Sequence, residues 1–332
     1  MTHLHNNPAD FVTEYLTGLQ LAHPDLVVAK VQDPGPYVTR ADHHDGEVAL
    51  ISGGGAGHEP LHAGFVGPGM LHGAVPGPIF TSPPPDPILA AIRAVDTGAG
   101  VVLIVKNYTG DVMNFEIAAE LAAAEGITCH HVLIADDVAV ADSTYTAGRR
   151  GVAGTMLVEK IAGAAAARGD DIHAVTQLAT HAAQRVFSMG VATQAGSRPG
   201  GDETFHLPAN AMEMGIGIHG EPGRAQLPIA SADAQVEQLV DQIVCELPAD
   251  ANELLVFVNG MGATTSAELY LCYRAAHEQL SARGYTIERS LVGSYVTSLD
   301  MHGVQLSVMA LDERLRDAWD APCRTPAYTH VG

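Results

Sequence analysis

Four short apolar runs constrain the fold of this chain most, because each is followed by glycines or polar residues and then by a stretch with helical spacing. The runs occupy residues 47–52 (EVALIS), 101–106 (VVLIVK), 131–135 (HVLIA) and 254–259 (LLVFVN). Short, continuous apolar runs are typical of strands covered on both faces, and their alternation with helices is typical of α/β proteins. The sequence therefore predicts an α/β fold in which mixed or mostly parallel sheets are flanked by helices.

Helical periodicity supports this fold class and suggests two domains. An N-terminal helix is predicted behind Asn7, a good cap, and Pro8, a good first helical residue. Further helices are predicted over residues 112–125, 152–168, 172–187, 232–247 and 265–283. From 188 to 228 the periodicity fades and Gly and Pro become frequent. We interpret this segment as the passage between two α/β domains, 1–187 and 188–332, and not as a free linker.

Composition excludes several functional classes. With 332 residues, of which 47% are hydrophobic and 17% charged, the chain is long enough to bury two cores. A net charge of −21 argues against nucleic-acid and membrane-surface binding. Residues 1–7 do not resemble a secretory signal, and no apolar run approaches the roughly 18 residues of a membrane helix. The four cysteines show no CxxC spacing, so we expect idle thiols in a reducing cytoplasm.

Glycines follow the first run, in the sequence GGGAGH at 53–58. Ligands of open α/β sheets bind beyond the carboxyl ends of strands, and glycines let backbone amides approach a ligand closely. The segment is neither a phosphate loop, since no Gly-Lys-Ser/Thr follows, nor a dinucleotide fingerprint. A tight turn without any ligand is the structural alternative.

The same segment formally matches a zinc-protease motif. His58, Glu59 and His62 spell HEPLH, which fits HExxH. That chemistry needs both histidines on one face of a continuous helix, and Pro60 between them opposes such a helix. We therefore disfavour a zinc site and predict no metal in this chain.

A turn with a cation and a carboxylate follows the second run. Lys106 and Asp111 flank this turn and provide one hydrogen-bond donor and one acceptor for substrate hydroxyl groups. The alternatives are a surface salt bridge for Lys106 and a helix-capping role for Asp111.

One histidine lies on an unusually glycine-rich backbone, in GIGIHGEPG at 215–223. His219 is one of seventeen histidines, so its setting must distinguish it. A neutral imidazole is a competent nucleophile, and a carboxylate such as Glu221 can fix which ring nitrogen is free to attack.

Taken together, these segments resemble the substrate-binding K subunit of dihydroxyacetone kinase over nearly the whole chain. Five further stretches match in the same order: GFVGPGML (64–71), IFTSP (79–83), GRRGVAGT (148–155), VNGMGAT (258–264) and YVTSLDMHG (295–303). The resemblance implies two α/β domains and covalent binding of a small ketose, dihydroxyacetone.

The resemblance also implies roles for individual residues. His219 would attack the ketone and form a hemiaminal, His58 would act as general base toward the hydroxyl to be phosphorylated, and Asp111 would lie beside that hydroxyl. Further pocket positions fall on Gly55, Ala56, Gly57, Ser82 and Lys106. The family often has serine at the position of Ala56, so a hydroxyl donor is lost and the preferred ketose stays open.

Cofactor and partner expectations follow from the same family. This chain should bind no nucleotide, since it ends where the K module closes. A separate L-type subunit carrying Mg with ADP or ATP would donate the phosphoryl group, often recharged by a phosphotransferase-system protein in bacteria. The expected protein is a cytoplasmic, homodimeric phosphotransferase with an alcohol acceptor.

Two other functions stay open. One is a ketose-sensing co-activator of a transcription factor without catalysis, and the other is a kinase subunit for erythrulose. The presence of His58 and Asp111 favours a kinase, because a sensor needs the covalent trap but no base.

Overall fold

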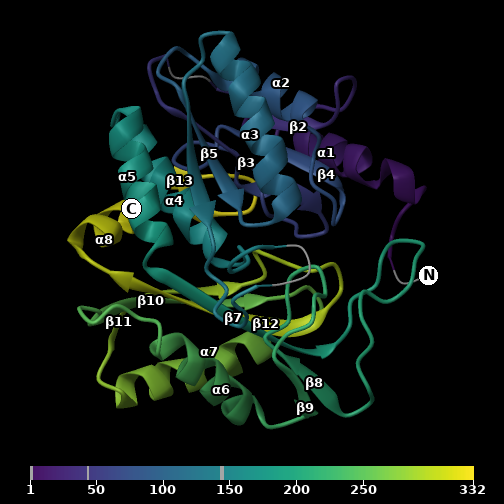
Figure 1. The fold of residues 1–332 in the computed structure, drawn as a ribbon, viewed down its shortest axis with the longest axis vertical. Helices are drawn as coiled ribbons and strands as arrows, with labels where there is room; N and C mark the ends of the chain where they lie inside the picture. Colours follow the sequence, from purple (N-terminus) through teal and green to yellow (C-terminus); the bar gives the residue numbers. More distant parts are fainter. Residues whose placement is uncertain (1–2, 43–44, 143–145) are drawn as a thin grey trace.

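Two six-stranded sheets and the helices around them make up the molecule (Figure 1). The computed structural model describes residues 3–42, 45–142 and 146–332, so the first two residues of the N-terminal segment 1–7 lie outside it. Both sheets are mixed, which confirms the predicted α/β class. Figure 1 draws the first sheet with α2 and α3 above the second sheet with α6 and α7.

The first sheet has the order β1-β2-β4-β3-β5-β6. Strands β4, β3, β5 and β6 run parallel. At the β4 edge, β2 pairs antiparallel with β4, and β1 pairs antiparallel with β2. Its strands are β1 (Val27–Lys30), β2 (Tyr37–Arg40), β3 (Ala49–Ala56), β4 (Gly73–Ile79), β5 (Val101–Lys106) and β6 (Cys129–Ile134). The helices of this half are η1 (Pro8–Asp10), α1 (Phe11–Ala22), η2 (Ala63–Phe65), α2 (Pro85–Val95), α3 (Thr109–Ala124), α4 (Gly154–Ala167) and α5 (Ile172–Ala183).

The second sheet has the order β11-β10-β12-β7-β8-β9, and only β10 and β11 pair in parallel. Its strands are β7 (Val186–Gln194), β8 (Ala211–Met214), β9 (Ala225–Pro228), β10 (Glu253–Gly260), β11 (Thr286–Gly293) and β12 (His302–Leu311). Helices α6 (Ala232–Val244) and α7 (Ser266–Ala282) cover one face of it, while α8 (Glu313–Asp320) packs against α4. Strands β13 (Cys323–Arg324) and β14 (Thr329–His330) form a small hairpin.

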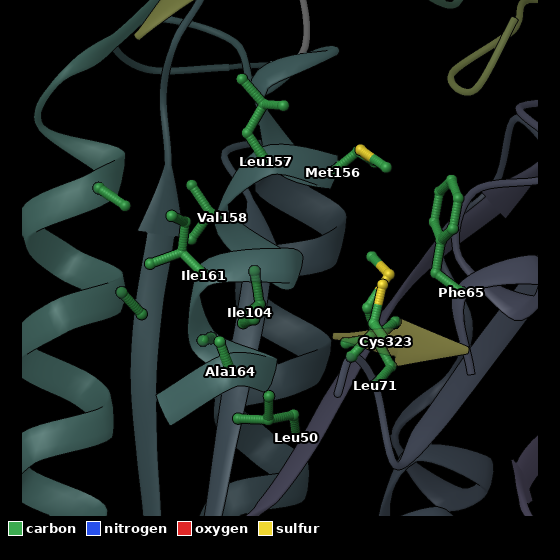
Figure 2. Packing of buried hydrophobic residues seen from close by; sticks show 14 of the residues in the cluster. Leu50, Phe65, Leu71, Ile104, Met156, Leu157, Val158, Ile161, Ala164 and Cys323 are labelled. Carbon is green, nitrogen blue, oxygen red and sulfur yellow. The ribbon is translucent and has the colours of Figure 1, made fainter. Parts of the chain in front are cut away.

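Helix α4 lies between the two sheets and carries the central core. Every residue from Gly154 to Ala166 is buried, including the charged residues Glu159 and Lys160, because the helix has neighbours on all sides. It contacts β3 and β5 of the first sheet and β7 and β12 of the second. Figure 2 shows its apolar side chains, among them Met156 and Ile161, packed with residues of the first half such as Leu50 and Phe65.

All the predicted helices are present, but three details of the prediction are wrong. Residues 188–228 do not merely connect two domains, because they supply strands β7, β8 and β9 of the second sheet. The helix predicted over 172–187 ends at Ala183, since the chain then enters β7. The glycines from Gly53 onward are not yet a loop, because β3 continues to Ala56.

The division after residue 187 stays a prediction. It falls within β7, and the C-terminal hairpin returns to the first half of the chain. There the amides of Arg324 and Ala327 donate to the carbonyls of Pro68 and Gly64, each at 2.9 Å.

Among the described residues, no helix is both long and apolar enough to cross a membrane.

Candidate active site

A cavity of about 780 Å³ lies where the carboxyl ends of β3 and β5 face the loop between β8 and β9. The predicted site residues Gly55, Ser82, Asp111 and His219 line it. Its other lining residues are Phe80, Thr81, Tyr108, Thr109, Gly110, Asn114, Arg198, Thr204, Gly220, Glu221 and Pro222. The predicted residues Ala56, Gly57, Lys106 and His58 do not belong to this lining. His58 nevertheless lies directly behind it, with its ring centroid 4.7 Å from that of His219.

The glycines at the end of β3 are needed because other groups occupy the space of their side chains. A Cβ on Gly54, whose φ is +152°, would lie 2.6 Å from Nζ of Lys106. A Cβ on Gly55 would lie 2.7 Å from Cα of Phe80. Both distances are too short for real contacts, so only glycine lets these elements converge on the cavity.

His219 is held by a carboxylate through its Nδ1 atom. Oε1 of Glu221 lies 2.9 Å from Nδ1, and Oε2 accepts the backbone N–H of His219 at 2.9 Å. Burial raises the pKa of Glu221, but the adjacent His219 and the Arg150 guanidinium outweigh it and bring that pKa to about 2. An ionised carboxylate only accepts, so Nδ1 of the neutral ring carries the proton and Nε2 presents a lone pair.

The neutral ring of His58 also carries its proton on Nδ1. Its Nδ1 lies 2.8 Å from the carbonyl oxygen of Thr297, so Nδ1 donates and Nε2 is unprotonated. The Nε2 atom is buried and has no partner. Burial, together with the nearby Lys106 ammonium, holds the pKa of His58 well below its ordinary value. The free protein therefore keeps this ring neutral and able to accept a proton at neutral pH.

Aromatic rings frame the two histidines. Phe80 stacks on His58 at 5.0 Å and meets His219 edge-on at 5.2 Å, and Tyr108 meets His219 edge-on at 4.6 Å. Phe80 also has a φ of 54°, an unusual conformation for a bulky residue and one that clusters at functional sites. The hydroxyl of Tyr108 is buried without a partner. Neither ring was assigned a role from the sequence, although Phe80 lies in the IFTSP stretch (79–83) and Tyr108 lies between Lys106 and Asp111.

Comparison with known proteins identifies the family. The family model of the Dak1 domain matches residues 17–327. The chain belongs to the Dak1 domain family. It is 45% identical to the dihydroxyacetone-binding subunit DhaK of the PEP-dependent dihydroxyacetone kinase of Escherichia coli (strain K12), over 98% of this chain and 99% of that protein. The resemblance predicted from the motifs is thereby confirmed.

Two solved structures are similar over almost the whole Dak1 chain. The native dihydroxyacetone kinase of C. freundii is 36% identical with a TM-score of 0.91, covering 99% of this chain and 60% of that one. The dihydroxyacetone kinase operon co-activator Dha-DhaQ is 34% identical with a TM-score of 0.90, covering 96% and 98%. The Dak1 chain thus spans about 60% of the C. freundii kinase and nearly all of the co-activator.

Lys106 is the first member of a buried series of hydrogen-bonded polar side chains. It is fully buried, so the surface salt bridge considered for it is wrong. Its ammonium donates to the Gly53 carbonyl at 3.1 Å and to Nε2 of His62 at 2.7 Å. Nδ1 of His62 in turn lies 2.5 Å from Oε1 of Glu159. The ammonium is thereby held beside the end of β3.

The HEPLH segment does not form the helix that a zinc motif requires. Residues 58–62 are turns, with cis peptide bonds at Glu59-Pro60 and Leu61-His62. His58 and His62 therefore bond different partners, Thr297 and the Lys106–Glu159 pair. Within the described ranges, no group of three or more His, Cys, Asp or Glu residues is arranged to hold a metal ion.

Asp111 does not cap α3, because the N-cap residue is Tyr108 and Asp111 lies in the first turn. Its carboxylate accepts a hydrogen bond from the Ser82 hydroxyl. Asp111 is also close enough to Lys106 to favour the charged ammonium, against the effect of burial. The family resemblance and the geometry agree in placing Asp111 and Ser82 at the cavity.

Glu159 gives a testable pH dependence of stability. Burial raises its pKa from 4.5 to about 8, although Lys106 opposes the shift. Between those values the folded protein keeps a proton that the unfolded chain has released, so this group's stabilising contribution is lost as pH rises. Relative to wild type, Glu159→Gln should gain unfolding free energy from about pH 5 to pH 8, by up to about 1.4 kcal/mol per pH unit.

Urea unfolding at several pH values measures this slope. Glu120→Gln, which removes an exposed carboxylate on α3, is the matched control and should leave the pH dependence as in wild type. A constant difference between Glu159→Gln and wild type over the whole pH range would contradict the prediction.

Proposed function

We propose that this chain is the ketose-binding subunit of a dihydroxyacetone kinase, a phosphotransferase with an alcohol acceptor. His219 binds the ketone covalently, and His58 and Asp111 face the hydroxyl that is phosphorylated. One observation carries the proposal: the two imidazoles lie 4.7 Å apart, with His219 in the cavity lining and His58 directly behind it, and each has Nδ1 fixed by a partner, which leaves Nε2 unprotonated. The similarity to the E. coli dihydroxyacetone-binding subunit supports the same substrate.

The covalent step uses the lone pair on Nε2 of His219. Nε2 attacks the carbonyl carbon and the π electrons move to the oxygen. Glu221 stabilises the positive charge that develops on the ring and accepts the Nδ1 proton. A proton from solvent converts the alkoxide into the hydroxyl of a hemiaminal, and Glu221 then releases its proton to solvent, so no net proton is gained or lost. Glycerol has no carbonyl group, so it cannot form this adduct however well its hydroxyls fit.

The second step is phosphorylation of a hydroxyl on the held ketose. The unpartnered Nε2 of His58 accepts the hydroxyl proton as the oxygen attacks the phosphoryl group. Asp111, which accepts from Ser82, is placed to orient that hydroxyl. Covalent attachment supplies the orientation that a triose, with few atoms, could not obtain from ordinary contacts.

The phosphoryl group comes from a separate L-type subunit that carries Mg with ADP or ATP. A cavity of about 780 Å³ is larger than a triose needs, which leaves space for the donor group beside the substrate. A homodimeric state, a cytoplasmic location and recharging by a phosphotransferase-system protein complete the proposal.

NMR with [2-¹³C]dihydroxyacetone tests the adduct directly. The labelled carbon should move from the ketone range to the range of a tetrahedral carbon when the protein is added, and labelled glycerol should show no change. The same experiment with labelled erythrulose compares the fraction of each ketose that forms the adduct. A ketone signal that stays unchanged at saturating protein would refute covalent binding.

A ketose-sensing co-activator is the second candidate, because the Dha-DhaQ co-activator has the same fold at a TM-score of 0.90. The two functions differ in phosphoryl transfer. With a supplied L subunit and ATP, the kinase reading predicts ketose phosphate, whereas a sensor forms the adduct and no product. The free Nε2 of His58 favours the kinase, since a sensor needs no base.

Gly217 gives a separate test of the His219 loop. A Cβ at this position would lie 2.1 Å from Oε2 of Glu221, so Gly217→Ala must displace the carboxylate that orients His219. We expect adduct formation to slow by about a hundredfold, as is typical for misplaced reacting groups. Gly18→Ala on α1 has open space around its new methyl group and is the matched control. Equal rates in both variants would contradict the assigned role of Glu221.

A further inference from the structure

Arg150 is buried beneath the loop that carries His219, yet the mechanism above does not use it. Its side chain is 0% exposed, and its Nε donates to Oδ2 of Asp137 at 2.7 Å. Its Nη2 donates to the Gly215 carbonyl at 2.8 Å, and its Nη1 reaches the Pro222 carbonyl at 3.4 Å. One guanidinium therefore ties together the two ends of the loop around His219.

The same guanidinium lies beside the carboxylate that orients His219. A Cβ on Gly217 would lie 2.1 Å from Oε2 of Glu221 and 2.8 Å from Nη1 of Arg150, so the two charged side chains converge on one glycine. The side chain of Glu221 is only 2% exposed. A carboxylate so deeply buried needs a nearby positive charge to stay ionised, and Arg150 supplies a permanent one.

Ionised Glu221 decides which nitrogen of His219 can attack. If the His219–Glu221 pair takes up a proton, the ring becomes either an imidazolium or, with a protonated Glu221 donating to Nδ1, the other neutral tautomer. Nε2 carries a proton in both cases and is no longer a nucleophile. A positive charge next to the pair opposes that proton uptake.

We propose that Arg150 is a positioning residue that keeps Glu221 ionised and thereby keeps Nε2 of His219 free to bind the ketone. This inference rests on the proposed function of His219. Arg150 is the second arginine of the GRRG motif, whose role the family resemblance left unassigned. The charged and titratable groups around His219 and Arg150 are Glu221, Asp137, Tyr108 and His58.

The pH profile of adduct formation tests this role. In Arg150→Met the profile, measured with [2-¹³C]dihydroxyacetone, should move to higher pH by about one unit, the smallest shift typical of losing an adjacent opposite charge. Arg150→Lys keeps the charge but loses the planar guanidinium that bonds the carbonyls of both Gly215 and Pro222. It should therefore keep the wild-type pH profile but form less adduct at every pH. Arg149→Gln is the matched control, because Arg149 pairs with Glu246 at 2.9 Å, away from Glu221. This variant should keep the wild-type profile.

Two outcomes would overturn the inference. Arg150→Met could lose adduct with an unchanged pH profile, which would indicate a purely structural role. Arg150→Lys could shift as far as Arg150→Met, which would exclude a role of the charge. If Arg150→Met does not fold, Arg150→Gln, which is also uncharged, takes its place in both comparisons.

A measurement without ketose separates this inference from the proposed function. ¹⁵N NMR of the His219 ring reports which nitrogen is protonated in the free protein. Wild type should show protonated Nδ1 and free Nε2 near neutral pH, and Arg150→Met should show Nε2 protonated up to higher pH. Should wild type form no adduct at all, these spectra still test Arg150.

Discussion

Replacing His219 with alanine will abolish the hemiaminal and reduce phosphorylation of dihydroxyacetone by about 10⁴-fold or more, since a freely diffusing triose loses the orientation that the covalent bond supplies. The side chain is 16% exposed at the cavity, and its partner Glu221 keeps a counter-charge in Arg150, so the fold should survive. The labelled-carbon NMR signal and thermal unfolding measure the two effects separately.

The control for this variant is His277→Ala, which removes an exposed histidine of α7 that does not line the cavity. That variant should form adduct and turn over as wild type does. A tetrahedral carbon signal that persists in His219→Ala would show that another group holds the ketose.

Replacing His58 with alanine should separate binding from transfer. The adduct should still form, because His219 and Glu221 are untouched, while phosphoryl transfer should fall by about 10²–10⁴-fold, the usual contribution of a general base. Product formation with a supplied L subunit and adduct formation by NMR provide the two measurements. Undiminished turnover in this variant would remove His58 from the role of base.

The pH dependence of kcat checks the same role in wild type. Burial, with the nearby Lys106 ammonium, holds the pKa of His58 well below 6.5. A base works while it is unprotonated, so a lowered pKa extends activity toward acid pH. We expect kcat to stay level as pH falls through 6.5, whereas a decline centred there would indicate an ordinary histidine base.

The central strands β3 and β5 could be predicted because they form apolar runs, whereas the edge strands β8 and β9, which lack such runs, could not. Strand β5 is buried at all six positions and β3 at all but one, so both appear in the sequence as continuous apolar or glycine-rich runs. Strands β8 and β9 are only four residues long at one edge of the second sheet, and β9 is largely exposed. Such strands lack a strong periodic pattern, which is why residues 188–228 looked like a connection.

The site was predictable where residues follow strands directly. Asp111 and the glycines follow the apolar runs of β5 and β3, and the rule for open α/β sheets already places ligands there. The approach of His219 from the β8–β9 loop depends on how the two sheets pack across α4, which no local pattern encodes. The glycine-rich setting of His219 marked it as a candidate, and the family resemblance supplied its role.

Arg150 could not be recognised from sequence for a different reason. Arginines are mostly exposed, and Arg149 beside it does form a surface ion pair. Only the structure distinguishes the two, because it shows Arg150 fully buried between Asp137 and the loop around His219.

The central claim is a bond between Nε2 of His219 and the carbonyl carbon of a small ketose. A crystal soaked with dihydroxyacetone near neutral pH tests it most directly. We predict continuous electron density from the ring nitrogen to a tetrahedral carbon, with a substrate hydroxyl directed toward Nε2 of His58. A planar ketone separated from the His219 ring, or a cavity without bound ketose, would contradict the account.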